Sequence, residues 1–306
     1  MSEIRFLNII LLTAFFIMIT LTFTHNSFGE NSTSQIIIQN NNNLSLDDYD
    51  SFITYLISKN LETKIEKVSA ILDIVSKIPE IGNKPYSSLL NKTISIYNGL
   101  PQDIEVEKRN ILKNILEKYS DFSVISLLMP NGDVYLQEPF FLQENLTKTN
   151  FSFRDYYKGA IESKNIFMDD VIISASSGLP ITVIAVPVYS DSNKLSGLVL
   201  GILNFENLNK FLQSINISTS QRILFLDHSG RIIADSLNNT SITGDISSFS
   251  NLQSFKNAIL GGSGKLVESI GNTEVAIYYH PVKAIQNTWV VLSMKSHDEG
   301  INSNIN

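Results

Sequence analysis

Between residues 49 and 78, apolar residues recur three or four positions apart, which is the spacing of one face of an α-helix. The stripe comprises Tyr49, Phe52, Ile53, Leu56, Ile57, Leu61, Ile65, Val68, Leu72, Val75 and Ile78. Ser45, Asp47 and Asp48 offer capping and dipole-matching groups at its start, and Pro79 ends it. A helix of this length spans about 45 Å. That is more than one compact domain usually needs, so we expect a spine against which two modules pack.

A second helix is predicted after Pro101, and from residue 122 the pattern becomes strand-like. Residues 123–129 form a predicted strand that ends at the hairpin turn 130–133 (Pro-Asn-Gly-Asp), and residues 134–136 return. We then predict a short helix over 153–164, strands over 170–174, 181–189 and 198–205, and a helix over 208–215.

The same order of elements then recurs. Strands are predicted over 222–226 and 231–234, a helix over 252–260, and strands over 264–269, 274–281 and 288–294. The fold class is therefore α+β: a long N-terminal helix carries two tandem modules, each a mixed sheet with short helices. The expected organisation is a leader (1–29), a linker (30–45), a helical spine (46–121), a membrane-distal module (122–215), a membrane-proximal module (216–295) and a tail (296–306).

The leader contains an uncharged apolar run over residues 7–23. As a helix it would reach about 25 Å, near the lower limit for a membrane span. Arg5 on its N-terminal flank favours keeping that end in the cytoplasm. Two interpretations remain open: an uncleaved signal-anchor of a single-pass membrane protein, or a signal peptide cut near Gly29 that leaves a secreted protein. Both place residues 30–306 outside the cytoplasm. No second apolar run follows, so we expect no cytoplasmic output domain.

Composition narrows the function further. A hydrophobic share of 43% excludes general disorder, and a net charge of -7 argues against a nucleic-acid partner. The chain has no cysteine, so disulfides, thiolate metal sites and cysteine nucleophiles are excluded. The polar surface consists largely of neutral side chains, with 31 Asn and 38 Ser. They form eight Asn-x-Ser/Thr sites, which matter if the host glycosylates exported proteins.

No catalytic or cofactor pattern emerges. The four histidines, at 25, 228, 280 and 297, lack metal-ligand spacing. The glycine-rich run 261–265 lacks the complete phosphate-loop pattern and opens a strand, and no Ser–His–Asp set can be argued from spacing. The pair Asp169-Asp170 favours a solvated strand entrance over a cation site. We expect no metal, no cofactor and no enzymatic activity.

Over residues 46–295 the chain resembles the double Cache (dCache) family of extracytoplasmic sensor domains, whose two modules are PAS-like. The resemblance rests on the order and spacing of several runs. These are 128–134 (LMPNGDV), 154–160 (RDYYKGA), 185–189 (AVPVY) with 197–199 (GLV), 227–234 (DHSGRIIA) and 288–291 (TWVV). The run at 154–160 resembles the family's R-x-W-Y-x-x-A helix.

The resemblance implies that the distal module binds a small molecule, often an amino acid or an organic acid, through this helix. Arg154 presents a planar fork of donors that matches a carboxylate. The rings of Tyr156 and Tyr157 could cover an aliphatic or ammonium part of a ligand and offer hydroxyls. Ser174 lies where a polar strand residue could face the pocket. We therefore predict Arg154, Tyr156, Tyr157 and Ser174 as ligand-binding residues.

The chain departs from the amino-acid-binding version of this motif. The usual Trp is Tyr156, and an aromatic position five before the Arg is Thr149. A later Tyr position falls near Ile172, and the Asp that holds an amino group would lie near Gly201 or Ile202. The carboxylate-binding half of the motif is kept and the ammonium-binding half is lost. A carboxylate or a neutral small molecule therefore fits better than an α-amino acid.

The sequence thus predicts an extracytoplasmic protein that binds or senses a small organic ligand, anchored by its N-terminal helix and acting on a membrane signalling partner. The alternative is a structural or partner-binding surface protein with a degenerate Cache pocket. That alternative predicts a small or apolar-filled pocket and a homodimer formed through the 46–78 helix.

Overall fold

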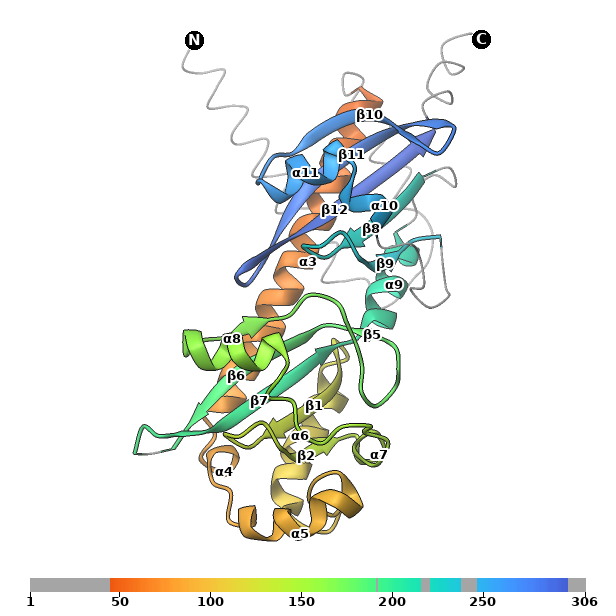
Figure 1. The fold of residues 1–306 in the computed structure, drawn as a ribbon. Helices are drawn as coiled ribbons and strands as arrows, with labels where there is room; N and C mark the ends of the chain where they lie inside the picture. Colours follow the sequence, from red (N-terminus) through yellow and green to blue (C-terminus); the bar gives the residue numbers. More distant parts are fainter. Residues whose placement is uncertain (1–44, 191, 216–220, 238–246, 297–306) are drawn as a thin grey trace, which may run out of the picture. The chain divides into compact units, whose positions relative to one another are not determined.

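The computed structural model describes residues 45–190, 192–215, 221–237 and 247–296 (Figure 1). The predicted apolar run at 7–23 and the cleavage position at Gly29 lie outside these residues. Within the described ranges, no helix combines the length and the apolar character that a membrane crossing requires. The residues from Asp48 onward belong to one compact unit.

The predicted long helix is confirmed as α3 (Leu46–Ser76). Most of the expected stripe forms its buried face, including Ile57, Leu61, Ile65, Val68, Leu72 and Val75, whereas Tyr49 is exposed and Ile78 lies beyond the end of the helix. These side chains share one hydrophobic core with residues from both large sheets, among them Ile125, Val199, Phe225 and Trp289. Burial of an amphipathic face, more than helix propensity, stabilises a helix of this kind.

Three helices separate α3 from the first sheet: α4 (Pro79–Gly82), α5 (Ser87–Tyr97) and α6 (Val106–Lys118). The helix predicted after Pro101 is α6. The sequence pattern missed α5 because only Leu90 and Thr93 of that helix are buried, which is too few to set a period.

The first sheet has five strands in the order β2-β1-β7-β6-β3. Their bounds are β1 (Phe122–Leu128), β2 (Val134–Glu138), β3 (Phe167–Met168), β6 (Val183–Tyr189) and β7 (Leu195–Leu203). The helices α7 (Phe140–Glu144) and α8 (Asp155–Ser163) lie between β2 and β3, and α9 (Phe205–Ser214) follows β7. The predicted strand 170–174 is shorter than expected: only β4 (Ile172–Ile173) is a strand, and it pairs with β5 (Pro180–Ile181) in a separate hairpin. These elements are called the first module below.

The second module repeats the plan. Its five-stranded sheet has the order β10-β11-β12-β8-β9. The strands are β8 (Gln221–Leu226), β9 (Ile232–Asp235), β10 (Gly264–Ile270), β11 (Thr273–Ala284) and β12 (Asn287–Ser296), with helices α10 (Ser247–Ser250) and α11 (Gln253–Ile259) between β9 and β10. Read from β9 to β10, this order matches that of the first sheet read from β2 to β3, so the α+β double-module prediction is confirmed.

One detail of the prediction is corrected. Every pair of strands within the described residues is antiparallel, so the sheets are not mixed. Tight hairpins join β1 to β2 and β8 to β9, and a short hairpin can only join antiparallel neighbours.

Both faces of the first sheet are buried. Successive residues of a strand point to opposite faces, so Ile184 and Val186 of β6 pack with α3, whereas Val183 and Ala185 pack with α8. Figure 1 shows α3 and α8 on opposite sides of this sheet. The sheet face under α8 is the one that carries the site described next.

Candidate functional site

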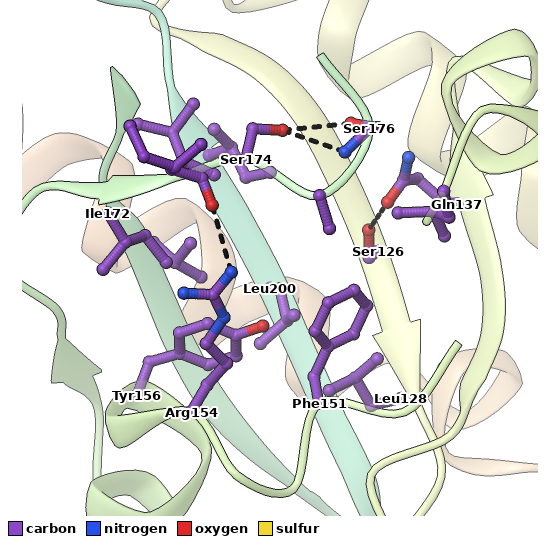
Figure 2. A pocket seen from close by; sticks show the side chains of 16 residues that line it. Ser126, Leu128, Gln137, Phe151, Arg154, Tyr156, Ile172, Ser174, Ser176 and Leu200 are labelled. Carbon is purple, nitrogen blue, oxygen red and sulfur yellow. Dashed lines mark hydrogen bonds between the residues drawn. The ribbon is translucent and has the colours of Figure 1, made fainter. Parts of the chain in front are cut away.

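A pocket opens on the α8 side of the first sheet (Figure 2). The cavity measures about 30 Å³, or about 420 Å³ with the open mouth included. Its walls come from β1, β2, β6 and β7, from the start of α8, and from the hairpin of β4 and β5. The lining residues are Ser126, Leu128, Gln137, Leu146, Phe151, Arg154, Tyr156, Ile172, Ile173, Ser174, Ala175, Ser176, Ile181, Val183, Leu200 and Ile202.

Helix α8 positions the predicted site. Arg154 is its N-cap residue, with extended backbone angles, and Asp155 in the first turn complements the helix dipole. Tyr156 and Ala160 lie one turn apart and are both buried, so they fix the face that packs on the sheet. The helix approaches β3 closely because Gly159 has no side chain: a Cβ there would lie 2.3 Å from the Phe167 ring.

The side chain of Arg154 points toward the middle of the lining residues (Figure 2). Its Nη2 donates a hydrogen bond to the carbonyl oxygen of Ile173, at 3.0 Å. Its Nε is buried and has no partner among the described residues. A guanidinium has five N–H donors, and a buried donor without an acceptor costs about 1–3 kcal/mol. Arg154 is therefore held in place by one bond and retains donor capacity for an acceptor in the pocket.

Tyr156 lies beside Arg154 and is only 4% exposed. Burial raises its pKa above the ordinary value for a phenol, although the charge of Arg154 acts in the opposite direction. The hydroxyl is therefore neutral and able to donate or accept. The structure thus brings Arg154 and Tyr156 together on the same wall of the pocket.

Tyr157 does not line the pocket. Its hydroxyl donates to the carbonyl oxygen of Pro130 at 2.6 Å, in the turn between β1 and β2. Neighbouring residues of a helix lie about 100° apart, so Tyr156 and Tyr157 cannot both face the same wall. Tyr157 anchors α8 to the hairpin turn.

Ser174 lines the pocket and is buried, but its hydroxyl oxygen already holds a turn together. It accepts from the backbone amides of Ser176 (3.3 Å) and Ser177 (3.2 Å) and contacts the Ser176 hydroxyl at 3.1 Å. The same loop is tied to Thr147, whose amide donates to the carbonyl of Ala175. Ser174 therefore shapes the edge of the pocket.

The sequence did not identify Ser126 and Gln137, which are paired across β1 and β2. The Ser126 hydroxyl donates to the Gln137 side-chain oxygen at 2.7 Å. The predicted strand ended at residue 136, and all five residues of β2 are buried, so no alternation of polar and apolar positions marked Gln137 as pocket-facing. A predicted strand that extended one or two residues further would have included Gln137.

The lining residues include no aspartate or glutamate. Asp169 lies nearby but outside the lining, is 7% exposed, and has its pKa raised to about 6 by burial, with a further contribution from the charge of Asp155. Its carboxylate accepts from the backbone amide of Asp170 at 3.0 Å. The pocket wall is therefore positive and rich in donors, a surface that suits an anion or an oxygen acceptor better than an ammonium group.

The positions at which this chain departs from the amino-acid-binding motif also contribute no acidic side chain to the pocket. Ile172 and Ile202 both line the pocket and make it apolar where Tyr and Asp were expected. Gly201 faces the other way, because a Cβ there would lie 2.6 Å from Leu72 of α3. Thr149 is outside the lining, and its carbonyl accepts from the amide of Val134.

The loop that leads into the pocket hairpin also contacts the second module. The amide of Val171 donates to Asp227 Oδ2 at 2.9 Å, and Arg231 donates to the carbonyl of Val171. Beside them, the Ser229 hydroxyl donates to Asp170 Oδ2 at 2.7 Å. Asp169 and Asp170 are therefore not a solvated strand entrance: Asp169 is buried and Asp170 lies at this junction.

Comparison with known proteins agrees with this geometry. The chain matches the model of the Cache domain family, dCache_1, over residues 29–305. A comparison with curated protein sequences returned no match.

Among solved structures, the ligand-binding domain of the Pseudomonas aeruginosa PAO1 amino acid chemoreceptor PctB, in complex with L-Gln, is similar at 13% identity and a TM-score of 0.59, covering 85% of this chain and 95% of that one. The ligand-binding domain of PctC from the same organism, in complex with GABA, shows 16% identity, a TM-score of 0.53 and coverage of 82% and 100%. An extracellular domain described as that of a histidine kinase, rpHK1S-Z16, shows 13% identity, a TM-score of 0.59 and coverage of 82% and 94%.

At these identities the solved structures establish a shared fold. Together with the family model, whose match contains all of the described residues, they lead to one conclusion. The chain belongs to the Cache domain family.

Proposed function

We propose that this chain is an extracytoplasmic binding and sensing protein that holds a small carboxylate-bearing ligand in the pocket of its first module. Cache membership supports the sensing role, and the similar domains of PctB and PctC were solved in complex with L-Gln and GABA. An N-terminal anchor would keep the domain at the outer face of a membrane. A membrane signalling partner would respond to the binding of the ligand.

The observation that carries this proposal is the position of Arg154. Its guanidinium lines the pocket, is fixed by a bond to Ile173, and retains a buried donor without a partner. A ligand carboxylate would supply the missing acceptor, and a charge-assisted hydrogen bond is stronger than a neutral one. Tyr156 would cover the ligand on the same wall, and Ser174 would hold the hairpin that closes over it.

The ligand class is narrower than that of the amino-acid receptors. Binding an ammonium group requires an acidic partner or several acceptors, and no acidic side chain lines this pocket. We therefore propose an organic acid without an α-amino group. The small volume of the pocket restricts the ligand to a few heavy atoms beyond the carboxylate, unless the hairpin opens.

A thermal-shift screen of small carboxylates against the purified full chain tests the proposal. A ligand that binds the folded state raises the melting temperature by mass action. Arg154→Ala should abolish the rise, and Arg154→Lys should retain only part of it, because lysine keeps the charge without the planar fork. The matched control is Lys158→Ala, an exposed cation on the same helix. Hits that persist unchanged in Arg154→Ala would show that this site is wrong.

The small volume also favours a second candidate, a structural or partner-binding protein whose pocket has lost its ligand. In that case no acid in the screen raises the melting temperature of the wild type. The double substitution Ser126→Leu/Gln137→Leu, which removes both partners of the buried hydrogen bond, would then stabilise the protein by apolar packing without loss of function. Under the sensing proposal, the same substitution abolishes every ligand-induced shift.

A further inference from the structure

The pocket has a second polar end, formed by Ser126 of β1 and Gln137 of β2. Both side chains are buried, at 3% and 4% exposure. In Figure 2 they lie on the opposite side of the view from the Arg154 guanidinium, with Leu200 and Phe151 drawn between. The arrangement is two polar groups at the ends of an apolar wall.

The backbone and one side-chain bond hold Gln137 rigidly. The backbone amide of Gln137 donates to Gln143 Oε1 at 2.9 Å, and its backbone carbonyl accepts from Arg109 at 3.3 Å. Arg109 in turn forms a buried ion pair with Glu138 at 2.7 Å. The side-chain oxygen of Gln137 accepts a hydrogen bond from the Ser126 hydroxyl. The side-chain amide of Gln137 is therefore preorganised, a condition that lowers the free-energy cost of binding.

The amide nitrogen, Nε2, has no partner among the described residues although it is buried. A buried donor without an acceptor costs about 1–3 kcal/mol, and such groups in native proteins call for an explanation. Two residues that line the pocket each carry a buried donor atom without a partner among the described residues: Nε2 of Gln137 and Nε of Arg154. A single ligand with an oxygen at each end would satisfy both.

We propose that Gln137, held by Ser126, is a specificity-determining residue that binds an oxygen acceptor at the far end of the ligand. The ligand class is then a short organic acid with a second carboxylate, keto or amide oxygen. This inference rests on the proposed function, because the first carboxylate is assigned to Arg154. It explains why the second polar end carries a neutral amide: a donor there selects an acceptor without adding charge.

The test compares matched acids by calorimetry on the full chain. The panel holds succinate and its half-amide, succinamate, against butyrate, which has the same chain length and no second acceptor. Wild type should bind succinate and succinamate about 10-fold or more tightly than butyrate, since a site built for a polar group rejects an analogue that leaves it unpaired. Gln137→Leu should reduce the affinity for the first two acids to that for butyrate and leave butyrate unchanged.

Gln137→Glu tests whether position 137 must donate a hydrogen bond, because it replaces the NH₂ donor by an acceptor oxygen. A carboxylate at this position should weaken succinate most, by repulsion, and leave butyrate nearest to its wild-type affinity. Ser126→Ala removes the hydroxyl that holds the amide and should give an intermediate loss of affinity for succinate and succinamate, with butyrate unchanged. The melting temperature of each ligand-free variant, compared with wild type, establishes that it is folded; a variant that does not fold is replaced by Ser126→Ala.

The outcomes distinguish this inference from the function on which it rests. If Arg154→Ala abolishes all binding while Gln137→Leu affects the three acids equally or not at all, the second subsite is wrong and the carboxylate site stands. If wild type binds none of the acids, or Arg154→Ala binds them as well as wild type, the carboxylate site itself is wrong.

Discussion

Asp227 of the second module accepts a hydrogen bond from the backbone amide of Val171 in the first module, at 2.9 Å. Val171 immediately precedes Ile172, Ile173 and Ser174, which line the pocket. The other oxygen of Asp227 caps its own hairpin turn, accepting from the amides of Ser229 (3.0 Å) and Arg231 (2.7 Å). One carboxylate thus connects the edge of the pocket to the first hairpin of the second module.

Asp227→Asn is predicted to break this connection and preserve the turn. The single amide oxygen should stay with the two turn amides, which places the NH₂ group against the Val171 amide. The expected cost is about 1–3 kcal/mol of unfolding free energy, together with faster hydrogen exchange at Val171. Exchange at Ser229 and Arg231 should not change.

The control is Asp133→Asn, whose carboxylate contacts Asn131 and Asn150 in its own module. It should leave Val171 exchange at the wild-type rate. Unchanged protection of Val171 in Asp227→Asn would rule out the connection.

From the raised pKa of Asp169, we predict that the free energy of unfolding falls as the pH rises from 4 to 6. Its folded pKa is about 6, above the ordinary 3.8, because burial disfavours the charged form. Between these values the folded state binds more protons than the unfolded state, so stability decreases as pH rises, by about 3 kcal/mol across the window.

Asp169→Asn should flatten this segment of the profile and raise stability at pH 7, as measured by urea unfolding at each pH. The exposed carboxyl of Asp103 supplies the control, since Asp103→Asn should keep the wild-type slope. A slope that survives in Asp169→Asn would assign the effect to another group.

Gly201→Ala should destabilise the packing of α3 on the first sheet. A Cβ at this position would lie 2.6 Å from Leu72 and 2.8 Å from Phe122, both buried core residues. Overpacking of this kind costs about 1–3 kcal/mol. Gly82→Ala serves as the comparison, because its Cβ would have its nearest contact at 3.4 Å. Equal melting temperatures for the two variants would contradict the close approach.

Ile74→Cys tests the homodimer expected through the long helix. Ile74 is 65% exposed on α3, and the chain has no native cysteine, so any disulfide formed must join two copies. If two copies meet along α3, mild oxidation should give a covalent dimer on a non-reducing gel at low protein concentration. Leu260→Cys, 87% exposed in the second module, should remain monomeric. Equal dimer yields from both variants would indicate random collision.

The fold was predictable because its main elements have clear periods. The stripe from Tyr49 to Ile78 set the helical period of α3, and the Gly-containing turns at 130–133 and 227–230 set the two hairpins. The short helix α5 was not predictable, since it buries too few residues to leave a period, and the strand predicted over 170–174 was longer than β4.

The site was predictable only where one helix carries it. Arg154 and Tyr156 could be placed on the pocket wall from their local run, although the same run also placed Tyr157 there. Residues three or four apart share a helix face and adjacent residues do not, so Tyr157 reached Pro130 instead. Gln137 lies on a strand buried on both sides, and its side chain is bonded to Ser126, eleven residues earlier, which no local pattern connects to it.

The matching strand orders of the two sheets make one position of the first module directly comparable with one position of the second. Arg154 caps α8 in the first module, and Leu252 holds the corresponding cap of α11 in the second. Leu252 packs against the core that contains Phe249 and Phe255, where Arg154 faces a pocket. At the same corner of the repeated plan, the first module therefore places a charged side chain at a pocket, and the second places an apolar side chain against a core. A substitution at position 154 would alter the lining of a pocket, whereas a substitution at position 252 would alter the packing of a core.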